Sequence, residues 1–230
     1  MRMSRRQFKR PLGERRYKKL FLIATEGSKT EPTYFTSLTG AASVVHVKTL
    51  EGQSRSAPHQ VLKRMKDYLD RERLQPSDEA WLVVDQDRWT DDQLTKLHQW
   101  SLQATNHGFA LSNPKFEYWL LLHFEDGSGI ASSKDCTNRL KRWIPDYDKG
   151  IDTRKIALAQ IKQAIRRAQK RDHPRCTDWP RTMGATTVYR LVVGCCRFHG
   201  HLDKVENGAG GGTWLREGSL RKSSRLRQSG

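Results

Sequence analysis

Residues 80–89 read Ala-Trp-Leu-Val-Val-Asp-Gln-Asp-Arg-Trp, and this stretch organises the rest of the chain. The run from residue 81 to residue 84 contains neither Gly nor Pro, which predicts a short buried strand. Asp85 and Asp87 follow at its C-terminal end. Side chains two residues apart on an extended chain share a face, so both carboxylates can point toward one place. Because a hard cation removes the repulsion between two such carboxylates, the stretch predicts a Mg²⁺ site.

A second acidic position follows the other clear apolar run of the chain. Residues 20–24 read Leu-Phe-Leu-Ile-Ala and predict a strand, which leads into Glu26 and Gly27. Gly27 is expected to permit a tight turn from strand to helix. Glu26 is then expected at the same sheet edge as Asp85 and Asp87, where α/β proteins place their sites. An isolated Asp-x-Asp is equally typical of a polar turn or a helix cap, so the second position is what favours a site.

Strands and helices alternate along the first part of the chain, which predicts an α/β fold with a parallel sheet covered by helices on both faces. Further strands are predicted at residues 43–50 and 109–111. Helices are predicted at residues 31–38, 59–73, 91–106, 113–124, 132–144, 153–171 and 185–197. The domain prediction is a core over residues 17–130 and a helical extension over residues 131–200 that packs on it. Residues 1–16 and the Gly-rich, basic residues 201–230 are expected to be disordered arms.

The predicted helix after residue 112 carries two charged side chains of interest. Asn113 is expected to cap it, with Pro114 at its first helical position. Lys115 and Glu117 then fall in the first turn, at the same sheet edge as the Asp pair. Glu117 suits the positive end of a helix dipole, whereas Lys115 opposes it. We therefore expect Lys115 near a negative group, the alternative being an ordinary surface charge.

The charge of the chain points to a polyanionic partner. The 230 residues include 42 Lys and Arg against 25 Asp and Glu, a net charge of +17 at pH 7. Nine of the first 19 residues are basic and only Glu14 is acidic, which suits an arm that binds phosphates without reading sequence. The predicted helix at residues 153–171 is also basic. For either segment a solvated, solubilising surface is the alternative.

The four cysteines show no CxxC spacing, which fits a reduced, cytoplasmic protein. No apolar run is long enough for a membrane span, and no signal peptide is expected. Cys195, Cys196, His199 and His201 are close enough in sequence to suggest zinc. Their spacing matches no standard zinc site, so two core thiols and two surface imidazoles are the stronger interpretation.

The acidic positions lie in segments that resemble a known family. Glu-Gly after one strand and Asp-x-Asp after a later one is the pattern of the Toprim domain, which binds Mg²⁺ for phosphoryl transfer. Residues 25–35 (Thr-Glu-Gly-Ser-Lys-Thr-Glu-Pro-Thr-Tyr-Phe), 84–87 (Val-Asp-Gln-Asp) and 112–124 (Ser-Asn-Pro-Lys-Phe-Glu-Tyr-Trp-Leu-Leu-Leu-His-Phe) resemble the RloB family. Residues 186–191 do so more weakly. RloB proteins are small Toprim-like proteins of prokaryotic defence loci, often paired with an AAA-type ATPase called RloA.

The resemblance covers roughly residues 17–195 and implies a Toprim-like, Rossmann-like fold and a metal-dependent nuclease acting on RNA or DNA in anti-phage defence. It implies control by an RloA-like ATPase. Glu26, Asp85 and Asp87 would hold Mg²⁺ or Mn²⁺, and Lys115 would offset the charge that develops on the phosphate. The possible second metal site or supporting groups are Glu31, Glu117 and Asn113. The alternative function is a non-catalytic nucleic-acid-binding adaptor, which explains the charge but leaves the converging carboxylates without a role.

Three other enzyme classes use parts of these motifs. Residues 27–30 (Gly-Ser-Lys-Thr) resemble the end of a P-loop, but the Gly that should stand five residues earlier is missing. Haloacid-dehalogenase phosphatases have Thr or Val two residues after Asp-x-Asp, where this chain has Trp89. Metal-dependent glycosyltransferases use Asp-x-Asp but give Glu26 no role. None of the three therefore explains both acidic positions.

Overall fold

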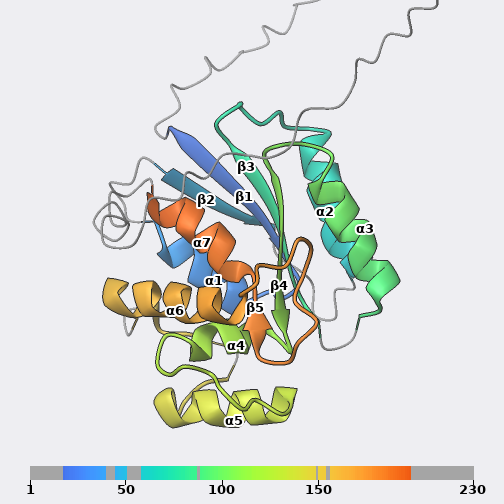
Figure 1. The fold of residues 1–230 in the computed structure, drawn as a ribbon. Helices are drawn as coiled ribbons and strands as arrows, with labels where there is room; N and C mark the ends of the chain where they lie inside the picture. The colour runs from blue at the N-terminus through green and yellow to red at the C-terminus, as the bar shows by residue number, and fades with distance from the viewer. Residues whose placement is uncertain are drawn as a thin grey trace, which may run out of the picture.

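A computed structural model describes residues 18–39, 45–50, 58–86, 89–148, 150–153 and 156–197. The two expected disordered arms and Asp87 lie outside the described residues. Five strands form one sheet in the order β2-β1-β3-β4-β5 (Figure 1). They are β1 (Lys19–Thr25), β2 (Val45–Leu50), β3 (Glu79–Asp85), β4 (His107–Asn113) and β5 (Ala185–Thr186). The first four are parallel and β5 is antiparallel to β4. The prediction of an α/β, Rossmann-like fold is confirmed.

Helices cover both faces of this sheet. They are α1 (Thr30–Ser37), α2 (Pro58–Leu69), α3 (Asp91–Ser101), α4 (Phe116–Leu121), α5 (Ser133–Trp143), α6 (Leu158–Arg171) and α7 (Val188–Arg197). In Figure 1, α2 and α3 lie on one side of the sheet, and α1, α4, α6 and α7 lie on the other. Within the described ranges, each helix is too short or too polar to cross a lipid bilayer.

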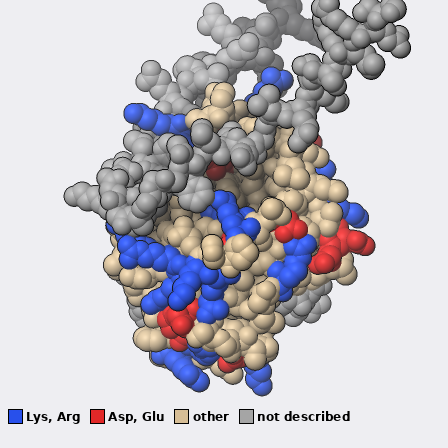
Figure 2. Space-filling model, in the orientation of Figure 1, with Lys and Arg blue, Asp and Glu red and all other residues tan. Residues whose placement is uncertain are grey.

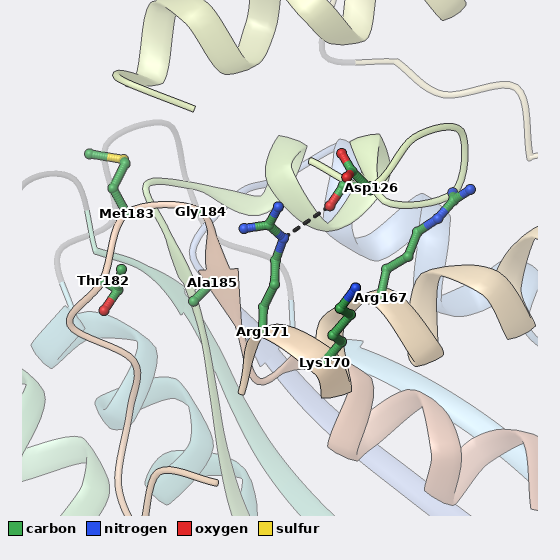
Figure 3. A pocket seen from close by; sticks show the side chains of 8 residues that line it. All are labelled: Asp126, Arg167, Lys170, Arg171, Thr182, Met183, Gly184 and Ala185. Carbon is green, nitrogen blue, oxygen red and sulfur yellow. Dashed lines mark hydrogen bonds between the residues drawn. The ribbon is translucent and has the colours of Figure 1, made fainter. Parts of the chain in front are cut away.

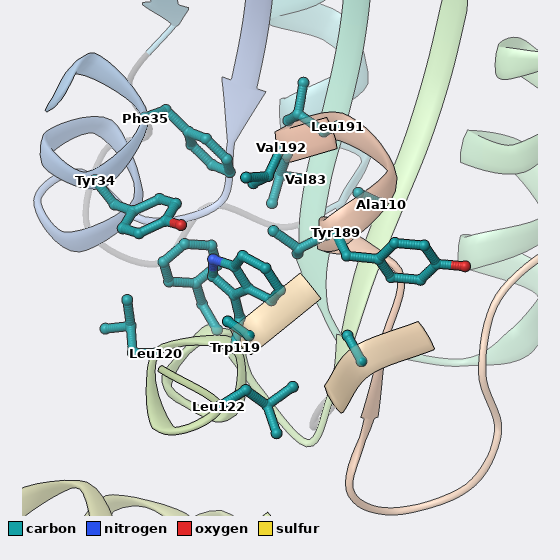
Figure 4. Close-up of a cluster of buried hydrophobic side chains, with 14 of the residues drawn as sticks. Tyr34, Phe35, Val83, Ala110, Trp119, Leu120, Leu122, Tyr189, Leu191 and Val192 are labelled. Atoms are coloured by element: carbon teal, nitrogen blue, oxygen red, sulfur yellow. The ribbon is translucent and has the colours of Figure 1, made fainter. Parts of the chain in front are cut away.

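The central strand β1 explains the two layers of the core. All seven of its residues are buried, because a parallel strand with helices on both faces needs apolar side chains in both directions. Phe21 and Ile23 pack with α1, α4, α5, α6 and α7, whereas Leu22 and Ala24 pack with α2 and α3. Figure 4 shows the first cluster, in which side chains of α1, α4 and α7 meet over the strands. The same cluster joins side chains of the predicted core segment to side chains of the helical extension.

The order of the strands puts a switch point between β1 and β3. The chain moves from β1 outward to β2, crosses back to β3, and then moves outward the other way to β4. At such a point the loops after the two central strands diverge, which opens a crevice at the carboxyl ends of the strands. Thr25 of β1 pairs with Val83 of β3, so the two strands end close together.

Two local predictions are wrong, and β5 accounts for both. The last helix begins at Val188 because Ala185 and Thr186 pair with the end of β4. Asn113 belongs to β4, where it pairs with Ala185, and its side-chain amide donates to the Arg181 carbonyl instead of capping a helix. Helix α4 therefore begins at Phe116, which leaves Lys115 as its N-cap residue.

Candidate functional site

Glu26 and Asp85 meet at the switch point. The Glu26 backbone N–H donates to the Val83 carbonyl at 3.1 Å, which extends the pairing of β1 and β3 by one step. The Asp85 backbone N–H then donates to Glu26 Oε2 at 3.2 Å. Both residues are half-buried. The structure thus brings together the acidic positions that follow the two apolar runs, at one edge of the sheet.

Trp89 holds the same carboxylate from the other side. Its indole N–H donates to Glu26 Oε2 at 3.0 Å. One oxygen of Glu26 therefore accepts from a backbone and from a side-chain donor on the loop after β3. Sequence reasoning treated Trp89 only as a mismatch to another enzyme class, and no sequence motif marks its contact with Glu26.

Glu31 lies behind Glu26, on the first turn of α1, and is 7% exposed. The Gly27 backbone N–H donates to Glu31 Oε1 at 3.0 Å. Burial, above all, raises the pKa of the Glu31 carboxyl to about 7; the charges of Glu117 and Glu26 act in the same direction, and backbone hydrogen bonds oppose them. Burial and two neighbouring carboxylates therefore favour the protonated form of Glu31.

The absence of a side chain at Gly27 makes room for the Glu31 carboxylate, and it is not needed for the backbone of the turn. The φ angle of Gly27 is outside the left-handed region, so the expected need for backbone freedom is wrong. A Cβ at this position would lie 2.3 Å from Glu31 Oε2. The missing side chain is what lets the Glu31 carboxylate approach the backbone.

Glu117 is held by a tyrosine that sequence reasoning did not find. The Tyr147 hydroxyl donates to Glu117 Oε1 at 2.9 Å and lies 3.4 Å from Thr30 Oγ1. Tyr147 is buried in the segment after α5, so it ties this segment to α1 and α4. It lies 30 residues from Glu117, and no sequence motif marks it.

Lys115 faces this group of acids. Its Nζ donates to Thr137 Oγ1 at 2.5 Å and lies 4.0 Å from Glu117 Oε1. Burial, above all, raises the pKa of the Cys136 thiol to about 12; the charges of Glu117 and Asp85 act in the same direction, while Lys115 opposes them. The charges of Glu117, Asp85 and Lys115 therefore all act on this buried thiol. We refer to Glu26, Glu31, Asp85 and Glu117 as the acidic cluster; Lys115 lies beside it.

The chemistry of the acidic cluster suits a hard cation. Carboxylate oxygens are the donors that Mg²⁺ prefers, and the charges of Glu117 and Glu26 add to burial in raising the pKa of Glu31. Among the described residues, no three Asp, Glu, His or Cys side chains form a complete metal-ligand set. Asp87, which the sequence places two residues after Asp85, is outside those residues.

The cysteines do not favour the zinc alternative. Cys195 and Cys196 are buried in α7 as free thiols, and burial raises the pKa of both, that of Cys196 to about 11. Zinc binds the thiolate, the form that burial disfavours. His199 and His201 lie outside the described residues.

These features define an α/β protein of Rossmann-like architecture in which the Glu26 carboxylate accepts from the Asp85 backbone at the switch point of a mostly parallel sheet. A comparison with protein families matches residues 21–193 to the RloB-like protein family. Because the match covers well over half of the 230 residues, the chain belongs to this family. Searches of curated proteins and of solved structures gave no match.

Proposed function

We propose that this protein is a Mg²⁺-dependent nuclease of the Toprim type, which cleaves phosphodiester bonds in RNA or DNA. One observation carries the proposal: Glu26, directly after β1, and Asp85, the last residue of β3, meet at the switch point, where the Asp85 N–H donates to the Glu26 carboxylate. In open α/β sheets this is where ligands bind. The crowding of buried acid around the pair supports a cation there, because isolated carboxylates would repel a phosphate.

In this proposal Glu26, Asp85 and Asp87 hold the metal. The metal would supply an activated water and stabilise negative charge on the phosphate. Glu26 would also serve as general base or acid. Lys115, held beside the cluster by Thr137, would contact the same phosphate. Glu31 or Glu117 would complete a second metal site.

The proposed role in the cell is taken from the resemblance to the RloB family. Anti-phage defence and control by an RloA-like AAA-type ATPase are the roles that the RloB resemblance implies. The net charge of +17 supports a nucleic acid as substrate. A reduced, cytoplasmic setting is consistent with the four free cysteines.

The direct test is a cleavage assay with tRNA, plasmid DNA and single-stranded DNA in Mg²⁺, Mn²⁺ or EDTA, with and without the co-expressed partner ATPase. Asp85→Asn should abolish cleavage while nucleic-acid binding remains. Asp92→Asn is the matched control, because Asp92 is an exposed carboxylate on α3. Cleavage that persists in EDTA or in Asp85→Asn would refute the proposal.

A second candidate is an adaptor that binds nucleic acid for a partner nuclease. The excess of positive charge favours it. If the protein is an adaptor, the native protein and the Asp85→Asn variant should bind nucleic acid equally well. Both should also support cleavage by the partner nuclease. The same assay therefore separates the two functions.

A further inference from the structure

A basic pocket lies beside the acidic cluster, at the end of α6. It has a volume of about 380 Å³. Arg167, Lys170 and Arg171 line one wall, Asp126 lies at the rim, and the backbone of Gly184 and Ala185 lines the other side (Figure 3). Figure 2 shows Lys and Arg side chains gathered on the same face of the molecule, over the region that α6 occupies in Figure 1.

Two arginines of the pocket are held in place without losing their charge. Arg171 Nε donates to the Asp126 carbonyl at 2.9 Å, and Arg167 Nη1 donates to the Leu122 carbonyl at 2.7 Å. Backbone carbonyls are neutral, so both guanidinium charges remain available. Within the described part of the chain, Arg167, Lys170 and Arg171 form no ion pair. Side chains ordered before binding lower the entropic cost of holding a ligand.

The acid at the rim does not neutralise the pocket. Asp126 Oδ1 accepts from the backbone N–H and the hydroxyl of Ser128 at 2.9 and 2.8 Å. These hydrogen bonds, above all, hold the pKa of Asp126 below its ordinary value, so it carries one negative charge. Three cations against one anion leave the pocket net positive.

The opposite wall is formed by Thr182, Met183, Gly184 and Ala185. Gly184 has a φ angle of 76°, in the left-handed region that favours glycine. Its N–H donates to the Asn113 carbonyl, which fixes this wall to the end of β4.

The sheet register relates the pocket to the acidic cluster. Asp85 pairs with Ser112, which pairs with Thr186, and Ala185 is the next residue of β5. Two strand spacings separate β3 from β5, so Ala185 lies about 10 Å from Asp85. This distance is short enough for one nucleic-acid strand to contact both the pocket and the acidic cluster.

We propose that this pocket binds a backbone phosphate of the nucleic-acid strand, a few nucleotides from the phosphate at the acidic cluster. The inference rests on the proposed function, because it assigns a position to the strand that the cluster would cleave. Arginine forks match phosphate oxygens with two hydrogen bonds, and Lys170 adds a mobile charge. The pocket would place the strand without reading its sequence.

The test is equilibrium binding of short labelled single-stranded RNA and DNA to the full-length protein in EDTA, where the proposed nuclease cannot cleave. Lys170→Gln with Arg171→Gln should weaken binding about tenfold or more. The slope of log affinity against log salt should fall by about one per lost phosphate contact. Arg166→Gln is the matched control, because Arg166 is an exposed cation of α6 that does not line the pocket. Lys170→Gln alone serves as a second variant, since Lys170 is exposed and its loss leaves the Arg171 contact intact.

Several results would overturn the inference. They are an unchanged affinity and salt slope in the pocket variants, a loss no larger than that of Arg166→Gln, or no binding by the native protein. A loss of polyglutamate binding without a loss of oligonucleotide binding would assign the pocket to an acidic peptide and also overturn it. The nuclease proposal can fail independently of the pocket. If the protein never cleaves, or cleaves equally well with Asp85→Asn, the pocket variants can still show a loss of oligonucleotide affinity.

Discussion

Replacing Glu31 by Gln should change how the stability of this protein depends on pH. Glu31 is nearly fully buried, and its neighbours Glu117 and Glu26 oppose its ionisation. Glutamine has almost the same shape and can still accept the hydrogen bond from the Gly27 N–H. The substitution therefore removes one titration from the acidic cluster while it leaves the packing of α1 in place.

The sign and size of the effect follow from the pKa of Glu31. The pKa is about 7 in the folded protein against 4.5 for an ordinary Glu, so the folded state binds the extra proton between these values. The contribution of Glu31 to the free energy of unfolding is fully present below pH 4.5 and is lost as the pH rises through 7. The shift corresponds to about 3 kcal/mol, since each pKa unit is worth about 1.4 kcal/mol. The Glu31→Gln variant does not lose stability in this way, because glutamine does not ionise.

The measurement is urea unfolding of both proteins from pH 4 to pH 9 in EDTA. The difference in free energy of unfolding, native minus Glu31→Gln, should fall by about 3 kcal/mol across the window from 4.5 to 7 and stay flat above it. Glu72→Gln, at an exposed position, should show no such window. Native and Glu31→Gln curves that run parallel through the whole range would refute the raised pKa of Glu31.

Two further substitutions test the neighbours of Glu31. Lys115→Met should lower the rate of single-turnover cleavage about 10²–10³-fold with nucleic-acid affinity nearly unchanged, and full activity would reduce Lys115 to a structural cation beside Thr137. Gly27→Ala should destabilise the protein by about 1–3 kcal/mol, because the new Cβ would overlap the Glu31 carboxylate. An unfolding midpoint equal to that of the native protein would show that Glu31 is free to move away.

The fold was predictable wherever burial on both faces left a continuous apolar run. Residues 20–24 and 81–84 could be assigned as strands for this reason, and acidic residues directly after parallel strands had to share one edge of the sheet. The proximity of Glu26 to Asp85 follows from those two facts. The hydrogen bond between them, and the indole of Trp89 on the same oxygen, depend on loop geometry that local patterns do not specify.

Long-range pairing explains what the sequence did not show. Asn113 and Pro114 have the chemistry of a helix start, but the two-residue strand β5, about 70 residues later, keeps Asn113 in the sheet. Tyr147 reaches Glu117 across 30 residues through a single hydroxyl. Such contacts leave no periodicity in the chain, so they become visible only when the elements are placed in space.

The acidic cluster and the basic pocket of α6 can act together on one nucleic-acid strand. A chain of net charge +17 attracts phosphates over its whole surface, yet its most buried charged groups at the switch point are carboxylates. Without a cation these carboxylates would keep a phosphate away, while the basic pocket of α6 would still bind the strand nearby. With a divalent cation the same carboxylates become its ligands and the repulsion is removed. Binding and cleavage would then depend on different residues, so substitutions at Lys170 and at Asp85 should have separable effects.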